Sequence, residues 1–256
     1  MTATQNKPRL IVTADDWGMS PHFNRGIAEC AKDGLVTSVS VLVNHPHVNP
    51  PELKALPVSI GLHLEIDTAK PILRQVRQQV KKFRKLFETT PSHIDGHQHV
   101  HFTDQRVARA VRILARSLKR PVRSLEEKDR AALQAAGVAT PASFIITWQR
   151  PINRIAKRIA ELGEGTHEMM VHPGYHDPEC TDPYNAERET EITLLRSREI
   201  KDALRKRKVQ LVNHTALHAG NSEQYKLENA NLSMAFGEEQ RAFYDKHVQR
   251  HGHLTS

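Results

Sequence analysis

Cysteine is scarce in this chain of 256 residues, which contains only Cys30 and Cys180. Their spacing matches neither a metal-binding nor a redox motif, and it favours a reducing cytosol over a disulfide framework. No apolar run approaches the roughly 20 residues that a membrane-spanning helix needs. The first residues, MTATQNKPRL, lack the apolar stretch of a signal peptide. We therefore expect a cytoplasmic protein with no membrane span.

Aromatic residues are also few, at 5%, whereas basic residues are in excess and give a formal net charge of +8. Much of this excess lies in two stretches with a helical pattern, Arg74–Lys85 and Arg196–Lys208. Basic runs without interleaved aromatics are more typical of solvated helix faces than of a surface that binds single strands. We expect no nucleic-acid partner, while an anionic substrate or an acidic partner stays open.

The apolar residues cluster in short runs that alternate with helical patterns. The predicted strands are Leu10–Thr13, Val36–Val43, Val58–Leu64, His93–Asp95, Pro121–Arg123, His167–Val171 and Val209–Val212. The clearest predicted helices are His22–Ala31, Gln75–Phe87, Arg106–Leu118, Ile152–Glu161 and Glu187–Lys206. This alternation predicts an α/β fold with about seven parallel strands, either a (β/α) barrel or, second, a doubly wound sheet. Both folds place functional residues at the carboxyl ends of strands. We expect one domain over residues 1–256, with 219–256 as a peripheral polar tail.

Two adjacent carboxylates, Asp15 and Asp16, follow the first predicted strand. Like charges this close raise the pKa of one of the two groups. One interpretation is an ordinary turn before a helix that Ser20 or Asp16 caps. The other is a metal site, in which one aspartate binds the ion and its neighbour acts as an acid or base.

The segment HIDGHQHVH is the strongest signal, because every second residue in it is histidine or aspartate. These residues are His93, Asp95, His97, His99 and His101. In an extended chain they would share one face, and imidazole is a common ligand of zinc-like metals. Since Gly96 suggests a bend, we expect one histidine to coordinate an ion while the others orient it or contact the substrate.

Single residues at the ends of other predicted strands are weaker candidates. His63 lies in an apolar run, where a core histidine is the commoner reading. Arg123 could pair with an active-site carboxylate or lie on the surface. His172 ends a strand before a Pro-Gly turn, where barrel enzymes keep catalytic groups. His214 lacks such a context, and we interpret it as structural.

Taken together, the motifs LIVTADDWGMS, GLVTSVSVLVN, GLHL, HIDGHQHVH and MMVHPGY resemble the YdjC-like family. This family includes chito-oligosaccharide deacetylases and hopanoid-biosynthesis-associated deacetylases. The resemblance runs from residue 9 to about residue 214. It implies a distorted TIM-like (β/α) barrel and metal-dependent N-deacetylation of an acetylated amino sugar or glycolipid. A homodimer would be consistent with the family.

The resemblance also implies roles for individual residues. Asp16, His63 and His97 would hold one divalent metal ion, Asp15 would be the base and His172 the acid. The residues expected around the metal site or against the substrate are Asp95, His99, His101, Arg123 and Asn44. Two imidazoles and a carboxylate suit zinc, whereas some family members are described with magnesium, so Zn²⁺ and Mg²⁺ both stay open.

Two features separate this chain from the family pattern. Trp17 stands where the family usually has phenylalanine, and the link Glu65–Pro91 is shorter than in chito-oligosaccharide deacetylases. The second difference leaves the size of the sugar substrate open. A metal-dependent phosphoesterase, another amidohydrolase, or a basic binding protein without turnover would be compatible with the same residues. One metal ion per chain would favour the deacetylase.

Overall fold

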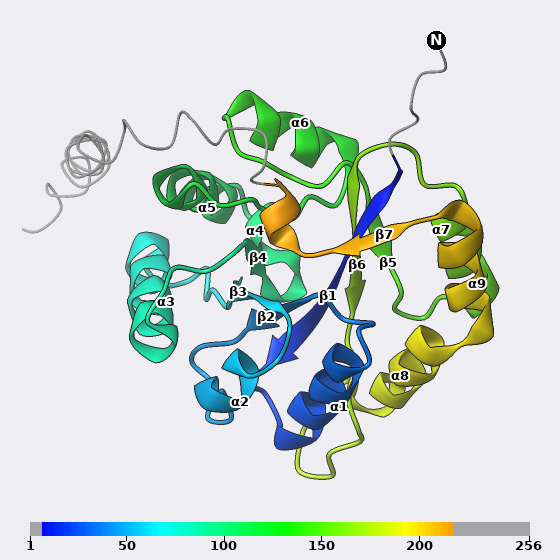
Figure 1. The fold of residues 1–256 in the computed structure, drawn as a ribbon. Helices are drawn as coiled ribbons and strands as arrows, with labels where there is room; N and C mark the ends of the chain where they lie inside the picture. The colour runs from blue at the N-terminus through cyan, green and yellow to red at the C-terminus, as the bar shows by residue number, and fades with distance from the viewer. Residues whose placement is uncertain (1–6, 218–256) are drawn as a thin grey trace, which may run out of the picture. The chain divides into compact units, whose positions relative to one another are not determined.

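A parallel sheet organises the computed structural model, which describes residues 7–217 (Figure 1). Its strands are β1 (Arg9–Trp17), β2 (Ser38–Val41), β3 (Ser59–Leu64), β4 (Ile94–Gly96), β5 (Phe144–Ile146), β6 (Thr166–Val171) and β7 (Gln210–Val212). The order is β4-β3-β2-β1-β6-β5, and β7 pairs with the first residues of β1. All of these pairings are parallel, so the carboxyl ends of the strands meet at one edge.

The sheet curls, so that its two edge strands approach one another. Beyond β4, Val122 forms a bridge with Ile94, and the Val122 backbone N–H donates to the carbonyl of Ala139 at 3.0 Å. The chain from Ala139 then leads into β5 at the other edge. The predicted α/β fold of a distorted barrel with about seven parallel strands is therefore confirmed.

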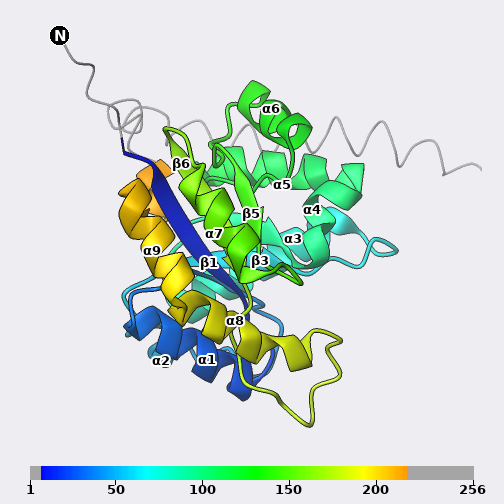
Figure 2. The ribbon, with the colours of Figure 1, turned by 90° about the vertical axis from the view of Figure 1, so that its right-hand side faces the viewer.

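Helices lie around the strands, as Figure 1 and, after a quarter turn, Figure 2 show. They are α1 (Pro21–Lys32), α2 (Pro50–Lys54), α3 (Ile72–Phe87), α4 (Val100–Thr103), α5 (Gln105–Leu118), α6 (Glu127–Ala135), α7 (Ile152–Ala160), α8 (Arg188–Arg196) and α9 (Arg198–Arg207). In α3, Val76, Val80, Phe83 and Phe87 recur on one face and are buried. The basic side chains of this helix lie on its exposed face, as the sequence predicts.

Four elements differ from the sequence prediction. Pro121–Arg123 was expected as a strand but forms only the bridge at Val122. Strand β5 and helix α6 were not predicted, because β5 is only three residues long and α6 has a weakly amphipathic pattern. The helix expected over Glu187–Lys206 is broken at Ser197, whose backbone is extended and whose hydroxyl caps α9.

No helix within residues 7–217 is both long and apolar enough to cross a membrane. Cys30 is buried and Cys180 half-buried, and neither forms a disulfide. The tail expected over 219–256 lies outside the described residues.

Candidate active site

The end of β1 turns two adjacent carboxylates toward the same histidine. Side chains that follow one another in a regular strand point to opposite faces. Here the register of β1 shifts between Ala14 and Trp17, and Asp16 has a left-handed φ of 71°. As a result, His63 Nε2 lies 3.9 Å from Asp15 Oδ2 and 3.5 Å from Asp16 Oδ1. Such backbone strain at a non-glycine residue is typical of functional sites.

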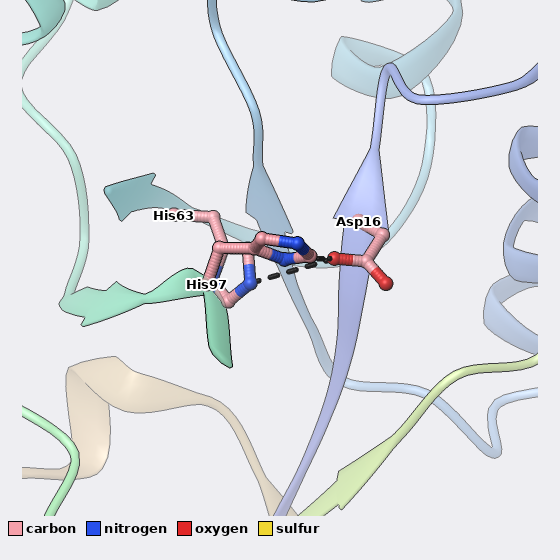
Figure 3. A group of neighbouring side chains, drawn as sticks. All are labelled: Asp16, His63 and His97. Atoms are coloured by element: carbon pink, nitrogen blue, oxygen red, sulfur yellow. Dashed lines mark hydrogen bonds and ion pairs between the residues drawn. The ribbon is translucent and has the colours of Figure 1, made fainter. Parts of the chain in front are cut away.

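Asp16, His63 and His97 form a compact cluster (Figure 3). His63 lies in β3 and His97 directly follows β4, so three strand ends supply the three side chains. His97 Nδ1 is 3.1 Å from Asp16 Oδ1. One ligand atom from each residue lies within 4.8 Å of the other two. Two imidazoles and a carboxylate are a donor set that can hold a zinc-like ion and leave a position open.

Asp95 holds the opposite side of the His63 ring. Its Oδ1 lies 2.7 Å from His63 Nδ1, and its Oδ2 accepts from the Ser40 hydroxyl at 2.7 Å. This contact turns His63 Nε2 toward Asp16, as carboxylates do for histidines that bind metals. Burial lowers the pKa of His63, but the charges of Asp95 and Asp15 outweigh burial and raise it to about 10. In the absence of an ion, His63 is therefore protonated at neutral pH.

Arg188 holds the second oxygen of Asp16 and was not singled out in the sequence. Its Nη2 lies 2.7 Å from Asp16 Oδ2 and 2.6 Å from Asp182 Oδ2. Its guanidinium carbon lies 3.7 Å from the centre of the Phe23 ring, and the side chain is fully buried. Although burial raises the pKa of Asp16, hydrogen bonds from His63 and His97 and the charge of Arg188 hold it well below the usual range.

Arg123 lies at the centre of a second buried cluster. It contacts Asp15 through both oxygens, at 2.6 and 2.8 Å. Its Nη2 also lies 2.8 Å from Asp95 Oδ2, and its Nε donates to Glu168 Oε1 at 3.0 Å. The structure thus gives Arg123 the carboxylate partner that its place in the sequence suggests.

Glu168, by contrast, was missed. It is a single charged residue within an apolar strand, and that isolation is the signal that could have identified it. Burial raises its pKa, although Arg123 opposes the shift.

His172 follows β6, the neighbour of β1 in the sheet, and is half-buried. Its ring meets the Tyr184 ring edge-on at 5.0 Å between centroids. Its backbone N–H donates to Glu191 Oε2 at 3.1 Å. Its charge contributes to the low pKa of Asp16, which places it within electrostatic reach of the cluster.

The extended conformation of β4 ends at Gly96. Residues His97–His99 form a 3₁₀ turn in which Gln98 and His99 have left-handed φ values of 50° and 57°. Helix α4 follows at once. The bend that Gly96 suggests is therefore present, and the backbone turns before the four imidazoles can share one extended face.

The remaining histidines of this segment lie apart from the Asp16 cluster. His93 stacks on His214 with ring centroids 3.5 Å apart, in the structural setting expected for His214. His99 is half-buried, and its ring meets the Phe144 ring edge-on. His101 is buried and lines a separate cavity of about 580 Å³ beside α5 and α6. Burial lowers the pKa of His93 and of His99 to about 4, so both rings are neutral.

Asn44, also expected near the site, lies exposed in the turn after β2. This position is at the carboxyl edge of the sheet, but the side chain does not join either buried cluster. Its expected contact with substrate stays a prediction.

Comparison with known proteins identifies similar chains. A family model described as YdjC-like protein matches residues 9–76 and 69–206. A carbohydrate deacetylase of Thermoanaerobacter pseudethanolicus is 28% identical, over 81% of this chain and 98% of its own length. A chitooligosaccharide deacetylase of Proteus mirabilis is 29% identical, over 79% of this chain and 96% of its own length.

Solved structures share the fold. A crystal structure from Enterococcus faecalis V583, provisionally assigned to cellobiose-phosphate cleavage, matches with a TM-score of 0.71 and 26% identity. It covers 83% of this chain and 99% of that one. The peptidoglycan deacetylase PdaC of Bacillus subtilis matches with a TM-score of 0.50 and 15% identity, over 90% of this chain and 98% of its own. At that identity the likeness concerns the fold alone.

Proposed function

This chain belongs to the YdjC-like protein family, and on that premise we propose that it is a divalent-metal-dependent carbohydrate deacetylase. Its substrate would be an acetylated amino sugar or a glycolipid that carries one. The names of the two relatives support the reaction. The observation that carries the proposal is the cluster of Asp16, His63 and His97, whose ligand atoms lie within 4.8 Å of one another.

The donor set fits a zinc-like ion better than magnesium, which prefers oxygen ligands. Asp95 and Arg188 support this fit. Asp95 binds His63 Nδ1 and leaves Nε2 facing the cluster, and Arg188 binds Asp16 Oδ2 and leaves Oδ1 facing the cluster. A divalent ion in this position would polarise an acetamide carbonyl and make a water molecule more acidic.

Asp15 would act as the general base. Its carboxylate lies beside His63, at the edge of the same cluster. The two contacts from Arg123 hold this carboxylate in one orientation. Asp15 would accept the proton of the water that attacks the amide carbon.

His172 would act as the general acid from the neighbouring strand end. The amine is a poor leaving group unless its nitrogen gains a proton. A protonated imidazole at the end of β6 can supply that proton, and contacts with Tyr184 and Glu191 hold this part of the chain. The products would be acetate and the free amino sugar.

Acetate release from N-acetylated mono- and disaccharides, with zinc, cobalt and magnesium supplied in turn, tests this function. We expect release that depends on an added ion and is abolished by chelation. An Asp15→Asn variant is the matched control, because it keeps the three proposed metal ligands. Release by the chelated protein at the rate of the metal-loaded protein would contradict the proposal.

The cytoplasmic location and the homodimer stay predictions.

A further inference from the structure

Two large apolar side chains remain exposed within residues 7–217, and both lie where β5 ends. Ile146 is 38% exposed and Trp148 is 49% exposed. Thr147, between them, is buried and points the other way, as alternation along an extended chain requires. The exposed indole therefore lies at the carboxyl edge of the sheet, where the candidate active site is also found.

The indole belongs to a row of aromatic rings that leads toward the cluster. Trp148 meets Tyr184 edge-on with centroids 5.4 Å apart, and Tyr184 meets His172 edge-on at 5.0 Å. The guanidinium carbon of Arg188 is 5.7 Å from the centre of the Tyr184 ring. Arg188 in turn holds Asp16. A chain of contacts through Tyr184 and Arg188 thus links the exposed indole to a proposed metal ligand.

Hydrogen bonds to Glu191 hold this row of aromatic side chains in place. The Tyr184 hydroxyl donates to Glu191 Oε1 at 2.8 Å. The Thr147 hydroxyl lies 2.7 Å from Glu191 Oε2, which also accepts the backbone N–H of His172. Glu191 thus ties together the loop that carries Trp148, the residue after β6 and the loop that carries Tyr184. A preformed surface of this kind binds a ligand with little loss of side-chain entropy.

We propose that Trp148, backed by Tyr184, is a sugar-binding subsite that takes a pyranose ring next to the sugar carrying the reacting acetyl group. This rests on the proposed function. A pyranose has a face of C–H groups and a rim of hydroxyls, which suits a flat indole bordered by polar groups. Because two side chains bridge Trp148 and Asp16, a neighbouring ring is favoured over the acetylated sugar itself. The substrate would then be at least a disaccharide.

Tryptophan fluorescence gives a direct test, because the chain has only two tryptophans and Trp17 is fully buried. Emission that acrylamide can quench therefore reports Trp148. We expect N,N′-diacetylchitobiose to remove most of this quenching and N-acetylglucosamine to remove little. Unchanged quenching at saturating disaccharide would overturn the subsite. Quenching reports binding and not turnover, so this result is independent of whether the wild-type protein releases acetate.

Variants of Trp148 and Ile146 test whether the subsite binds a sugar ring or an acyl chain. For the disaccharide, we expect Trp148→Ala to raise KM about fivefold to tenfold with a much smaller effect on kcat, and Trp148→Phe to recover most of the loss. Trp148→Leu should behave like the alanine variant, and Ile146→Ala, the matched control, should match the wild type. Equal losses from Ile146→Ala and Trp148→Ala, or a wild-type KM for Trp148→Leu, would indicate an acyl chain and overturn the proposal.

Discussion

Replacing Arg123 with methionine removes the positive charge at the centre of the candidate site while keeping most of the side-chain volume. Arg123 is 1% exposed and contacts three buried carboxylates, those of Asp15, Asp95 and Glu168. The substitution leaves these groups without their cation. Removing one partner of a buried ion pair costs about 3–5 kcal/mol. Because three carboxylates share this cation, we expect a loss in the free energy of unfolding within that range at neutral pH.

The difference in the free energy of unfolding between the wild type and Arg123→Met should shrink as the pH falls. In the wild type the folded pKa of Asp95 is depressed, so its stabilisation is present above its unfolded pKa and is lost in acid. Without Arg123, the folded pKa of Asp95 rises, and that of Glu168, which burial already raises in the wild type, rises further. The variant then gains stability by taking up protons as the pH falls. Proton uptake by the variant reduces the difference between the two proteins toward about pH 5, and the loss of the Asp95 stabilisation in the wild type reduces it further only in stronger acid.

Urea unfolding followed by the fluorescence of buried Trp17 measures this difference. Arg116→Met, on the exposed face of α5, is the matched control and should change stability by less than about 0.5 kcal/mol. Arg123→Lys keeps a charge but not the two-pronged contact, so its loss should be smaller than that of the methionine variant. An Arg123→Met protein within about 1 kcal/mol of the wild type would refute the reasoning.

Four further predictions concern the proposed metal ion and the base. Asp15→Asn should keep the metal Kd within about threefold and lower turnover at least about 100-fold, as measured by calorimetry and acetate release; comparable turnover would exclude Asp15 as the base. Because the raised pKa of His63 keeps it protonated below about pH 10, ion binding must displace a proton, and affinity should rise up to about tenfold per pH unit. Calorimetry in buffers of different ionisation enthalpy would detect that proton, and its absence would count against His63 as a ligand. Arg188→Met should weaken metal binding about 10- to 100-fold because it frees Asp16 Oδ2, and an unchanged Kd would show that this contact is dispensable. His101→Phe should leave the Kd within about twofold because His101 lines a separate cavity, so a large loss would place it in the site.

The sequence predicts the barrel and the strand ends well because these depend on local patterns. Apolar runs mark β1, β2, β3 and β6 to within a few residues, and the candidate site residues lie at or just after the carboxyl ends of strands. Asp16, His63 and His97 come together because parallel strands bring their carboxyl ends to one edge. The family resemblance then separates His97 from the other histidines of its segment, which residue spacing alone did not do.

The parts that failed depend on tertiary contacts or on single dihedral angles. The turn at Gln98 and His99 needs two left-handed residues, which no alternation pattern reveals. Arg188 stands among charged residues at the start of the predicted helix Glu187–Lys206 and looks like a solvated residue, although it packs against Phe23 and Asp16, which are far away in the chain. Trp148 lies in a loop after a strand too short to produce a pattern.

Metal titration by calorimetry tests the central claim most directly, with the wild type compared with a His63→Ala/His97→Ala double variant. We predict one zinc ion per wild-type chain and loss of that binding in the double variant, while circular dichroism shows that the variant is folded. A folded double variant that still binds one ion with wild-type affinity would contradict the assignment of Asp16, His63 and His97 as the metal site.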